Sequence, residues 1–171
     1  MRLATVPSGT RPVSDRAREG LFSCLGVRVE GARVLDLFAG TGALGIEALS
    51  RGAARALFID SAPAATKTIA QNLARTRLAA RGEVRRVDAM RWIRQERGEF
   101  DLILLDPPYR LPPKELDEVL AAVANRGLPA AGGVVVLTRP GKGYTPVIPV
   151  DWLLERRLSY GDAVLLVFMT S

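Results

Sequence analysis

The sequence predicts an α/β fold in which a mostly parallel, seven-stranded sheet carries helices on both faces. Three observations indicate it. Short apolar runs alternate with amphipathic stretches along most of the chain, as in strand–helix–strand units. Each of the first four runs has an aspartate within it or directly after it. Two further apolar runs flank Gly161-Asp162, and we expect a β-hairpin there that places an antiparallel strand at one edge of the sheet.

Length and composition suit a single globular domain. We expect an N-terminal arm and helix over residues 1–26 and the α/β core over 27–171. The residues are 48% hydrophobic and 25% charged, which is typical of a soluble protein. No apolar run reaches the length of a membrane span, and the N-terminus has no signal-peptide pattern. A single cysteine permits no intrachain disulfide, so we expect a cytoplasmic protein. We also expect the protein to be a monomer.

The first helix is predicted from its cap and its apolar stripe. Ser14 can cap a helix that runs to about Leu25 and stops at Gly26. Arg16 and Arg18 lie off the inward-facing stripe. That stripe follows helical spacing at Ala17, Leu21, Cys24 and Leu25.

The alternating elements then follow in order. Strands are expected at 33–38, 55–59, 83–87, 101–105 and 133–138, and helices at 43–50, 63–78, 89–97 and 113–125. Residues 139–150 hold three prolines and two glycines and are predicted to form a loop. Strands at 152–159 and 163–169 form the hairpin.

A glycine-rich turn joins the first strand to the helix at 43–50. Residues 40–45 read GTGALG, and Asp60 lies about 20 residues beyond, which together match a dinucleotide-binding fingerprint. Asp36, inside the strand before the turn, opposes that interpretation because it would repel a pyrophosphate and attract a positive ammonium group. A NAD-binding oxidoreductase therefore remains an alternative rather than the preferred interpretation.

Aspartates follow the next strands as well. Asp60 and Asp88 end parallel strands, so both should project toward the edge that holds the glycine turn. One can bind two ribose hydroxyls and the other an adenine amino group. An amino acid, a ribose and an adenine along one sheet edge indicate S-adenosyl-L-methionine as the cofactor. The expected cofactor-binding residues are Asp36, Phe38, Ala39, Gly40, Gly42, Asp60, Asp88 and Ala89.

The fourth strand ends in Asp106-Pro107-Pro108-Tyr109, the candidate catalytic residues. A carboxylate and the Pro107 carbonyl can accept both N–H groups of an exocyclic amine, which localises its lone pair toward an incoming methyl group. The two prolines fix the backbone, and Tyr109 offers a face on which a base can stack. The alternative is a rigid strand-to-helix turn without a catalytic role.

Two absences narrow the chemistry. The chain has no histidine and one cysteine, which excludes the usual zinc ligand sets and a histidine-dependent triad, and we expect no metal site. Cys24 is predicted to be a core residue, so attack of a thiolate on a pyrimidine ring is not expected. The net charge of +6 comes mostly from arginine, which suits a nucleic-acid partner, although a general composition bias would explain it too.

These motifs resemble those of the amino-methylating class I methyltransferases, which have a Rossmann-like fold, and most closely those of the RsmD family. The matching blocks are residues 11–22 (RPVSDRAREGLF), residues 35–53 (LDLFAGTGALGIEALSRGA) and residues 106–109. The resemblance implies methylation of the N2 amine of one guanine, expected to be guanine 966, in 16S rRNA, either free or in the 30S subunit. It also implies RNA contacts by Arg11, Arg16, Arg18 and Arg110, where a solvated helix face is the alternative for Arg16 and Arg18.

The chain departs from the family pattern in two places. Family members usually begin with a longer N-terminal hairpin rich in glycine and arginine, and they usually have glutamate where this chain has Asp60. An adenine-N6 methyltransferase acting on DNA or RNA is the second enzymatic hypothesis, because the motif at residues 106–109 is shared with such enzymes. A non-enzymatic RNA-binding module is a further alternative.

Overall fold

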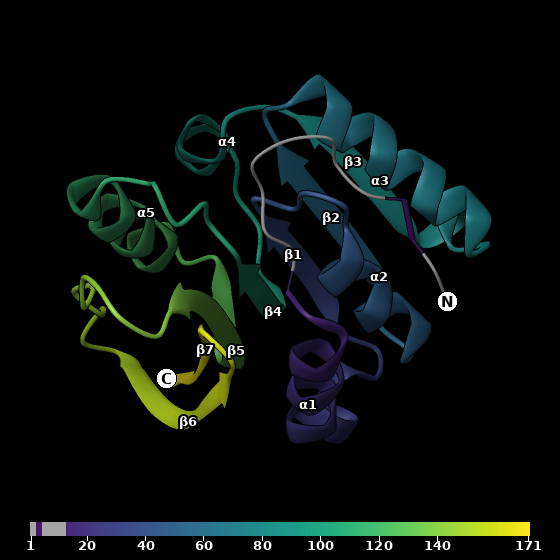
Figure 1. Cartoon of the computed structure of the whole chain (residues 1–171). Helices are drawn as coiled ribbons and strands as arrows, with labels where there is room; N and C mark the ends of the chain where they lie inside the picture. The colour runs from purple at the N-terminus through teal and green to yellow at the C-terminus, as the bar shows by residue number, and fades with distance from the viewer. Residues whose placement is uncertain (1–2, 5–12) are drawn as a thin grey trace.

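Seven strands form one sheet in the computed structural model, which describes residues 3–4 and 13–171 (Figure 1). The strands are β1 (Arg33–Leu37), β2 (Arg55–Asp60), β3 (Gly82–Arg86), β4 (Phe100–Leu105), β5 (Pro129–Pro140), β6 (Trp152–Tyr160) and β7 (Ala163–Thr170). Their order across the sheet is β3-β2-β1-β4-β5-β7-β6. The first five are parallel, and β7 runs antiparallel to both of its neighbours. The predicted fold class is therefore confirmed.

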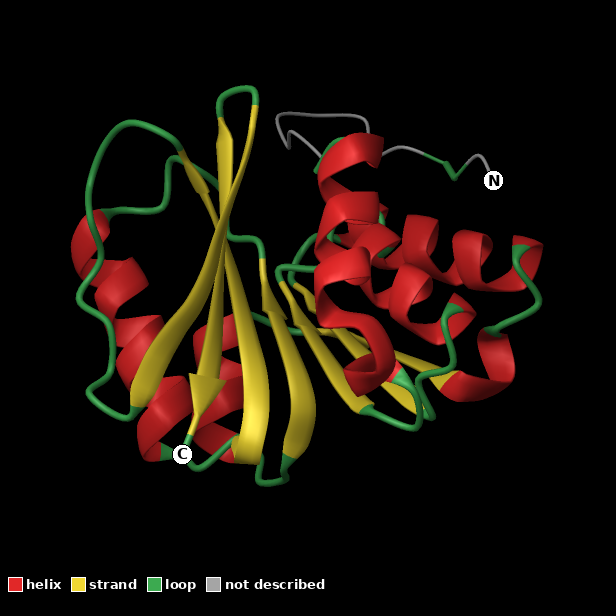
Figure 2. Ribbon diagram, turned by 90° about the horizontal axis from the view of Figure 1, so that it is seen from below, coloured by secondary structure: helices red, strands yellow, loops and turns green. Residues whose placement is uncertain are grey.

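Helices cover the two faces of the sheet unequally (Figure 2). They are α1 (Asp15–Leu25), α2 (Ala43–Ser50), α3 (Pro63–Arg75), α4 (Ala89–Gln95) and α5 (Pro113–Asn125). Side chains of α1, α2 and α3 form one apolar cluster with alternate strand residues, and α4 and α5 form the other cluster with the remaining strand residues. None of the described helices is both long and apolar enough to cross a bilayer.

The C-terminal hairpin takes a specific place in the sheet. Gly161, with φ of 57°, turns the chain between β6 and β7. The hairpin lies at one edge, as the sequence predicts, and its reversed strand β7 is inserted between β5 and β6. Because β7 pairs with Arg139 and Pro140, strand β5 runs two residues beyond its predicted end and takes up the start of the predicted loop.

Helix α1 is capped as predicted, but its buried face differs. The Ser14 Oγ accepts a hydrogen bond from the Ala17 N–H at 3.1 Å, and Gly26 ends the helix with φ of 56°. Phe22 is buried, whereas Cys24 is only partly buried. The prediction that Cys24 belongs to the core was wrong, because the sheet contacts α1 over a face that is rotated toward Phe22.

Helix α3 is three residues shorter than predicted. It ends at Arg75, and Arg77 adopts a left-handed conformation with φ of 60°. A 3₁₀ turn over Ala79–Arg81 then leads into β3. The apolar pattern predicts a helix to residue 78 because Leu78 is apolar. Leu78 does pack onto the core, but it does so from the turn after the helix.

Candidate active site

The glycine turn follows β1 in a run of left-handed conformations. Phe38, Gly40 and Gly42 have φ of 60°, 59° and 79°. The Gly42 N–H donates to the carbonyl of Ala39 at 2.8 Å and thereby closes the turn just before α2. A left-handed conformation costs a phenylalanine about 1–3 kcal/mol, and such strain is concentrated at binding sites. The turn is thus held in the shape that exposes the backbone at the start of α2.

Asn72 of α3 fixes this turn from outside and was missed by the sequence analysis. Its Nδ2 donates to the carbonyl of Thr41 at 2.9 Å, and its Oδ1 accepts from the N–H of Ala4 at 2.7 Å. The side chain is fully buried. The sequence does hold one signal that could have identified Asn72: it is a polar residue that lies between Ile69 and Leu73, two apolar residues that are buried. Asn72 therefore joins the N-terminal segment to the glycine turn.

Three of the predicted acids hold backbone groups at the carboxyl edge of the sheet. Asp36 is 1% exposed and accepts from the N–H of Gly45 at 3.1 Å. Asp60 accepts from the N–H of Gly40 and from that of Ala62, both at 2.9 Å. Asp88 caps α4 by accepting from the Arg91 N–H at 3.1 Å. These contacts anchor the backbone where strands lead into helices, so the structure gives the three acids a local structural role, and their contact with a cofactor stays a prediction.

The charges at this edge repel one another. Burial raises the pKa of Asp36 well above its usual value, the Gly45 N–H opposes that rise, and the neighbouring carboxylates of Asp106 and Asp60 add to it. Three carboxylates so placed favour a cation and disfavour a phosphate. Asp36 therefore lies in an electrostatic environment that favours a cation, and its contact with the cofactor stays a prediction.

A cavity of about 250 Å³ lies between the glycine turn and helices α4 and α5. Three of its lining residues, Phe38, Asp88 and Ala89, are expected cofactor-binding residues. The others are Met90, Leu111, Glu115, Glu118 and Val119. A wall that combines five apolar side chains with three carboxylates suits a flat ring that carries an amino group.

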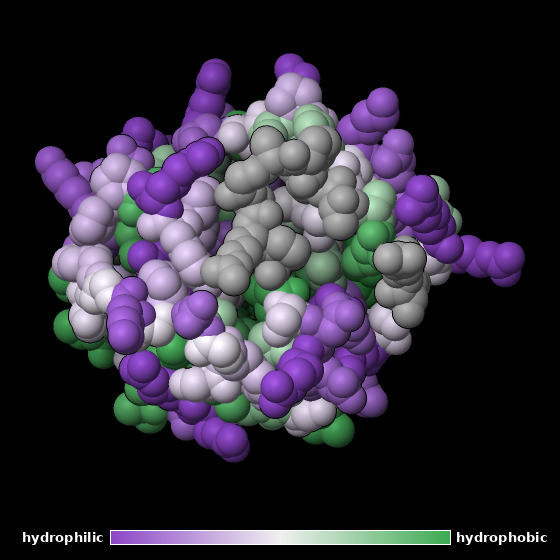
Figure 3. Space-filling model, in the orientation of Figure 1, coloured by the Kyte–Doolittle hydropathy of each residue, from purple (hydrophilic) through white to green (hydrophobic). Residues whose placement is uncertain are grey.

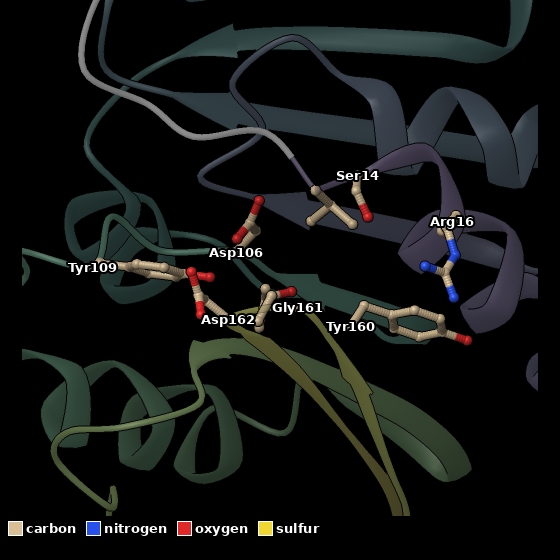
Figure 4. Close-up of a pocket in the computed structure, with 10 residues that line it drawn as sticks. Ser14, Arg16, Asp106, Tyr109, Tyr160, Gly161 and Asp162 are labelled. Atoms are coloured by element: carbon tan, nitrogen blue, oxygen red, sulfur yellow. The ribbon is translucent and has the colours of Figure 1, made fainter.

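A second cavity of about 370 Å³ lies at the carboxyl edge of the sheet, beside the start of α1. Figure 4 shows Asp106 and Tyr109 at this cavity together with Arg16 of α1 and Tyr160 of the hairpin. Its remaining lining residues are Val13, Ser14, Thr138, Gly161, Asp162 and Ala163. The structure thus brings the predicted catalytic loop together with hairpin residues that the sequence analysis did not identify, because only the long-range pairing of β7 places them there.

Asp106 is the titratable centre of this second cavity. Burial raises its pKa to about 7, against the attraction of Arg139. The carbonyl of Pro108 accepts from the Leu111 N–H at 2.9 Å, which closes the turn after Pro107. Tyr109 is 39% exposed and therefore presents part of its ring for contact.

The predicted RNA-binding arginines differ in their surroundings. The Arg16 guanidinium lies 6.0 Å from the centre of the Tyr160 ring, at the cavity. Arg18 pairs with Asp15 and with Glu47, both at 3.1 Å, so its guanidinium is already engaged by carboxylates. Arg110 is exposed, and Arg11 lies outside the described residues. In the view of Figure 3, hydrophilic side chains project around the margin of the molecule.

Tyr160 forms part of the wall of the second cavity, and its position depends on a glycine in α1. A Cβ on Gly20 would lie 1.7 Å from the Tyr160 Oη. We expect Gly20→Ala to displace this ring and to lower the free energy of unfolding by about 1–3 kcal/mol. In a Tyr160→Ala background, the same substitution should instead stabilise the protein by about 1 kcal/mol through helix propensity. Urea unfolding of the four variants measures both values, and equal effects in the two backgrounds would contradict the packing role.

Comparisons with known proteins identify the family. A family model described as "conserved hypothetical protein 95" matches residues 1–169. Ribosomal RNA small subunit methyltransferase D of Escherichia coli is 34% identical over 154 residues, which cover 90% of this chain and 76% of the relative. The chain belongs to the RsmD family.

Solved structures share the fold of this chain. The Escherichia coli protein yhhF superposes with a TM-score of 0.87 and 33% identity, covering 98% of this chain and 91% of that one. An RNA methyltransferase from Salinibacter ruber, in complex with S-adenosyl-L-homocysteine, superposes with a TM-score of 0.71 and covers 94% of each chain. At 17% identity, the second match concerns the fold alone. The predicted Rossmann-like methyltransferase fold is confirmed.

Proposed function

We propose that this RsmD-family protein transfers a methyl group from S-adenosyl-L-methionine to the exocyclic N2 amine of a guanine, guanine 966, in 16S rRNA. One observation carries the proposal most directly: Asp106 and Tyr109 line the same cavity at the carboxyl edge of the sheet. An rRNA substrate would place the activity in the cytoplasm.

The acid cluster supports the choice of cofactor. Asp36, Asp60 and Asp106 together favour a positively charged ligand. S-adenosyl-L-methionine supplies an electrophilic methyl group on a positively charged sulfur. We assign the smaller cavity, with Phe38 and Asp88, to the adenosine end of the cofactor, and the glycine turn to backbone contacts with it.

The loop after β4 would carry the chemistry. Asp106 and the Pro107 carbonyl accept the two N–H groups of the amine, which localises the nitrogen lone pair in the direction of attack. Tyr109 stacks on the base and orients it. Asp106 also takes up the proton that the nitrogen releases once it holds the methyl group, and a pKa near 7 suits that role. No metal is required for this reaction.

Mass mapping of modified nucleosides tests the proposal. 16S rRNA and 30S particles that lack the methyl group are incubated with the protein and labelled cofactor, with and without EDTA. We expect N2-methylguanine as the product and no effect of the chelator. Labelled N6-methyladenine in RNA or DNA would favour the adenine-N6 alternative instead, which the motif at residues 106–109 keeps open.

Two further outcomes separate the remaining alternatives. Calorimetric titration with S-adenosyl-L-methionine and with NAD should show binding of the first only, whereas binding of NAD alone would indicate an oxidoreductase. RNA binding without any methyl transfer would indicate a non-enzymatic module.

A further inference from the structure

Arg139 is a buried arginine at the carboxyl end of β5. Along this strand the side chains alternate, so Arg139 continues the face of Val135 and Leu137, which pack in the cluster with α4 and α5. Thr138 points to the opposite face and lines the cavity of Asp106. The guanidinium is therefore inside the protein, on the α5 side of the candidate catalytic loop, and the residue is only 7% exposed.

The contacts of Arg139 are unusual for a buried cation. Its Nε and Nη1 atoms make no hydrogen bond with any residue in the described ranges 3–4 and 13–171, and no ion pair among these residues includes it. Its guanidinium carbon lies 6.0 Å from the centre of the Tyr109 ring, within the range of a cation–π contact. A buried guanidinium with two nitrogen atoms that make no hydrogen bond is costly to maintain, so a functional reason for it is expected.

Tyr109 and Asp106 are the two groups that this charge faces. Burial lowers the pKa of Arg139, and the nearby Tyr109 and Asp106 oppose that change. In return, Arg139 opposes the rise in the pKa of Asp106 that burial causes. Both neighbours belong to the loop that we propose to hold the target amine.

We propose that Arg139 is a positioning residue for methyl transfer, whose guanidinium supports the ring of Tyr109 and supplies the positive charge that faces Asp106. The inference rests on the proposed function, because it assigns a task to Arg139 through those two residues. Without that charge, Asp106 would be more fully protonated at neutral pH and would accept the N–H groups of the amine less well.

Other charged and titratable groups also surround Asp106. Asp36 of β1 is close enough that Asp106 raises its pKa, and the cavity wall adds Arg16 from α1 together with Tyr160 and Asp162 from the hairpin. Arg139 is the cation whose attraction lowers the pKa of Asp106, whereas Arg16 lies over Tyr160. A substitution at Arg139 should therefore change the titration of Asp106 more than a substitution at Arg16.

The test compares Arg139→Met, which removes the charge, with Arg139→Lys, which keeps it but removes the planar group. We expect Arg139→Met to move the acid limb of the pH profile of kcat/KM upward by about one pH unit, as loss of a nearby opposite charge does. At pH 6 this shift corresponds to about a tenfold loss of rate. Arg139→Lys should keep the limb near its wild-type position and raise KM for the RNA through the loss of ring support. Arg28→Met, which removes a partner of Glu155 on the surface, serves as the matched control and should leave the limb in place.

A ¹³C NMR titration of the Asp106 carboxyl in the ligand-free protein provides a readout that needs no turnover. An upward shift of its midpoint in Arg139→Met supports the inference, and an unchanged midpoint together with an unchanged acid limb overturns it. If the wild-type protein methylates no amine, the proposed function fails. The titration then still shows whether the charge of Arg139 affects the ionisation of Asp106. Arg139→Gln serves as a second neutral variant if Arg139→Met does not fold, as judged by circular dichroism.

Discussion

Asp106→Asn is expected to lower kcat by about 10²- to 10³-fold, the usual cost of removing one group that stabilises developing charge. Asparagine keeps the shape of the side chain, but it cannot take up the proton of the amine, and it carries no negative charge. The affinity for the cofactor should change far less than turnover, because Asp36 and Asp60 remain in place. Single-turnover methylation and calorimetric titration measure the two quantities.

The pH dependence of kcat/KM provides a second test of the role of Asp106. Burial raises the pKa of Asp106 to about 7, so wild-type kcat/KM should fall as the pH drops below that value. The residual activity of Asp106→Asn should show no such limb. Asp101→Asn is a matched control, since Asp101 lies near the start of β4, at the end of the strand far from Asp106, where it binds Arg33. Full turnover by Asp106→Asn, or an equal loss in Asp101→Asn, would contradict the catalytic assignment.

Asp36→Asn is expected to make the ligand-free protein more stable at neutral pH while it abolishes tight cofactor binding. Burial raises the pKa of Asp36 in the folded state, so the folded protein holds this proton more tightly than the unfolded chain does. Stability is therefore lost as the pH rises from the unfolded pKa, about 4, toward the raised folded value. Asparagine does not titrate, and its side-chain oxygen can still accept from the Gly45 N–H.

Thermal unfolding across pH measures this effect. The melting temperatures of wild type and Asp36→Asn should agree near pH 4 and diverge above it, with the variant higher. Asp101→Asn should show the opposite sign. Although burial alone raises the pKa of Asp101, the N–H groups of Arg33 hold it below its usual value. An Asp36→Asn protein that is less stable than wild type at pH 7 would indicate that the carboxylate contributes to folding.

Local signals in the sequence predicted much of the fold. Pro63 and Pro113 mark the observed starts of α3 and α5, and Ser14 caps α1 as expected. The four aspartates after or within the first strands lie at one edge because parallel strands end there together. These features depend on spacing of a few residues, which a sequence displays directly.

Long-range pairing decided what the sequence did not show. Arg139 was assigned to a loop because Pro140 and Gly141 follow it, yet β7 pairs with this segment and makes Arg139 a buried strand residue. The hydrogen bond and ion pair of Arg18 depend on Glu47, which lies 29 residues away in the sequence. The role of Asn72 depends in the same way on Thr41, 31 residues away. Such partners are fixed only once the sheet and its covering helices are assembled.

The insertion of β7 between β5 and β6 also bears on synthesis of the protein. During translation β5 and β6 emerge from the ribosome before the strand that joins them, so neither can complete its hydrogen bonding until β7 follows. The same hairpin supplies Tyr160, Gly161 and Asp162 to the cavity of Asp106. A nascent chain whose β7 is still inside the ribosome therefore lacks one assembled wall of the cavity of Asp106, and this topology would delay substrate recognition until β7 has emerged.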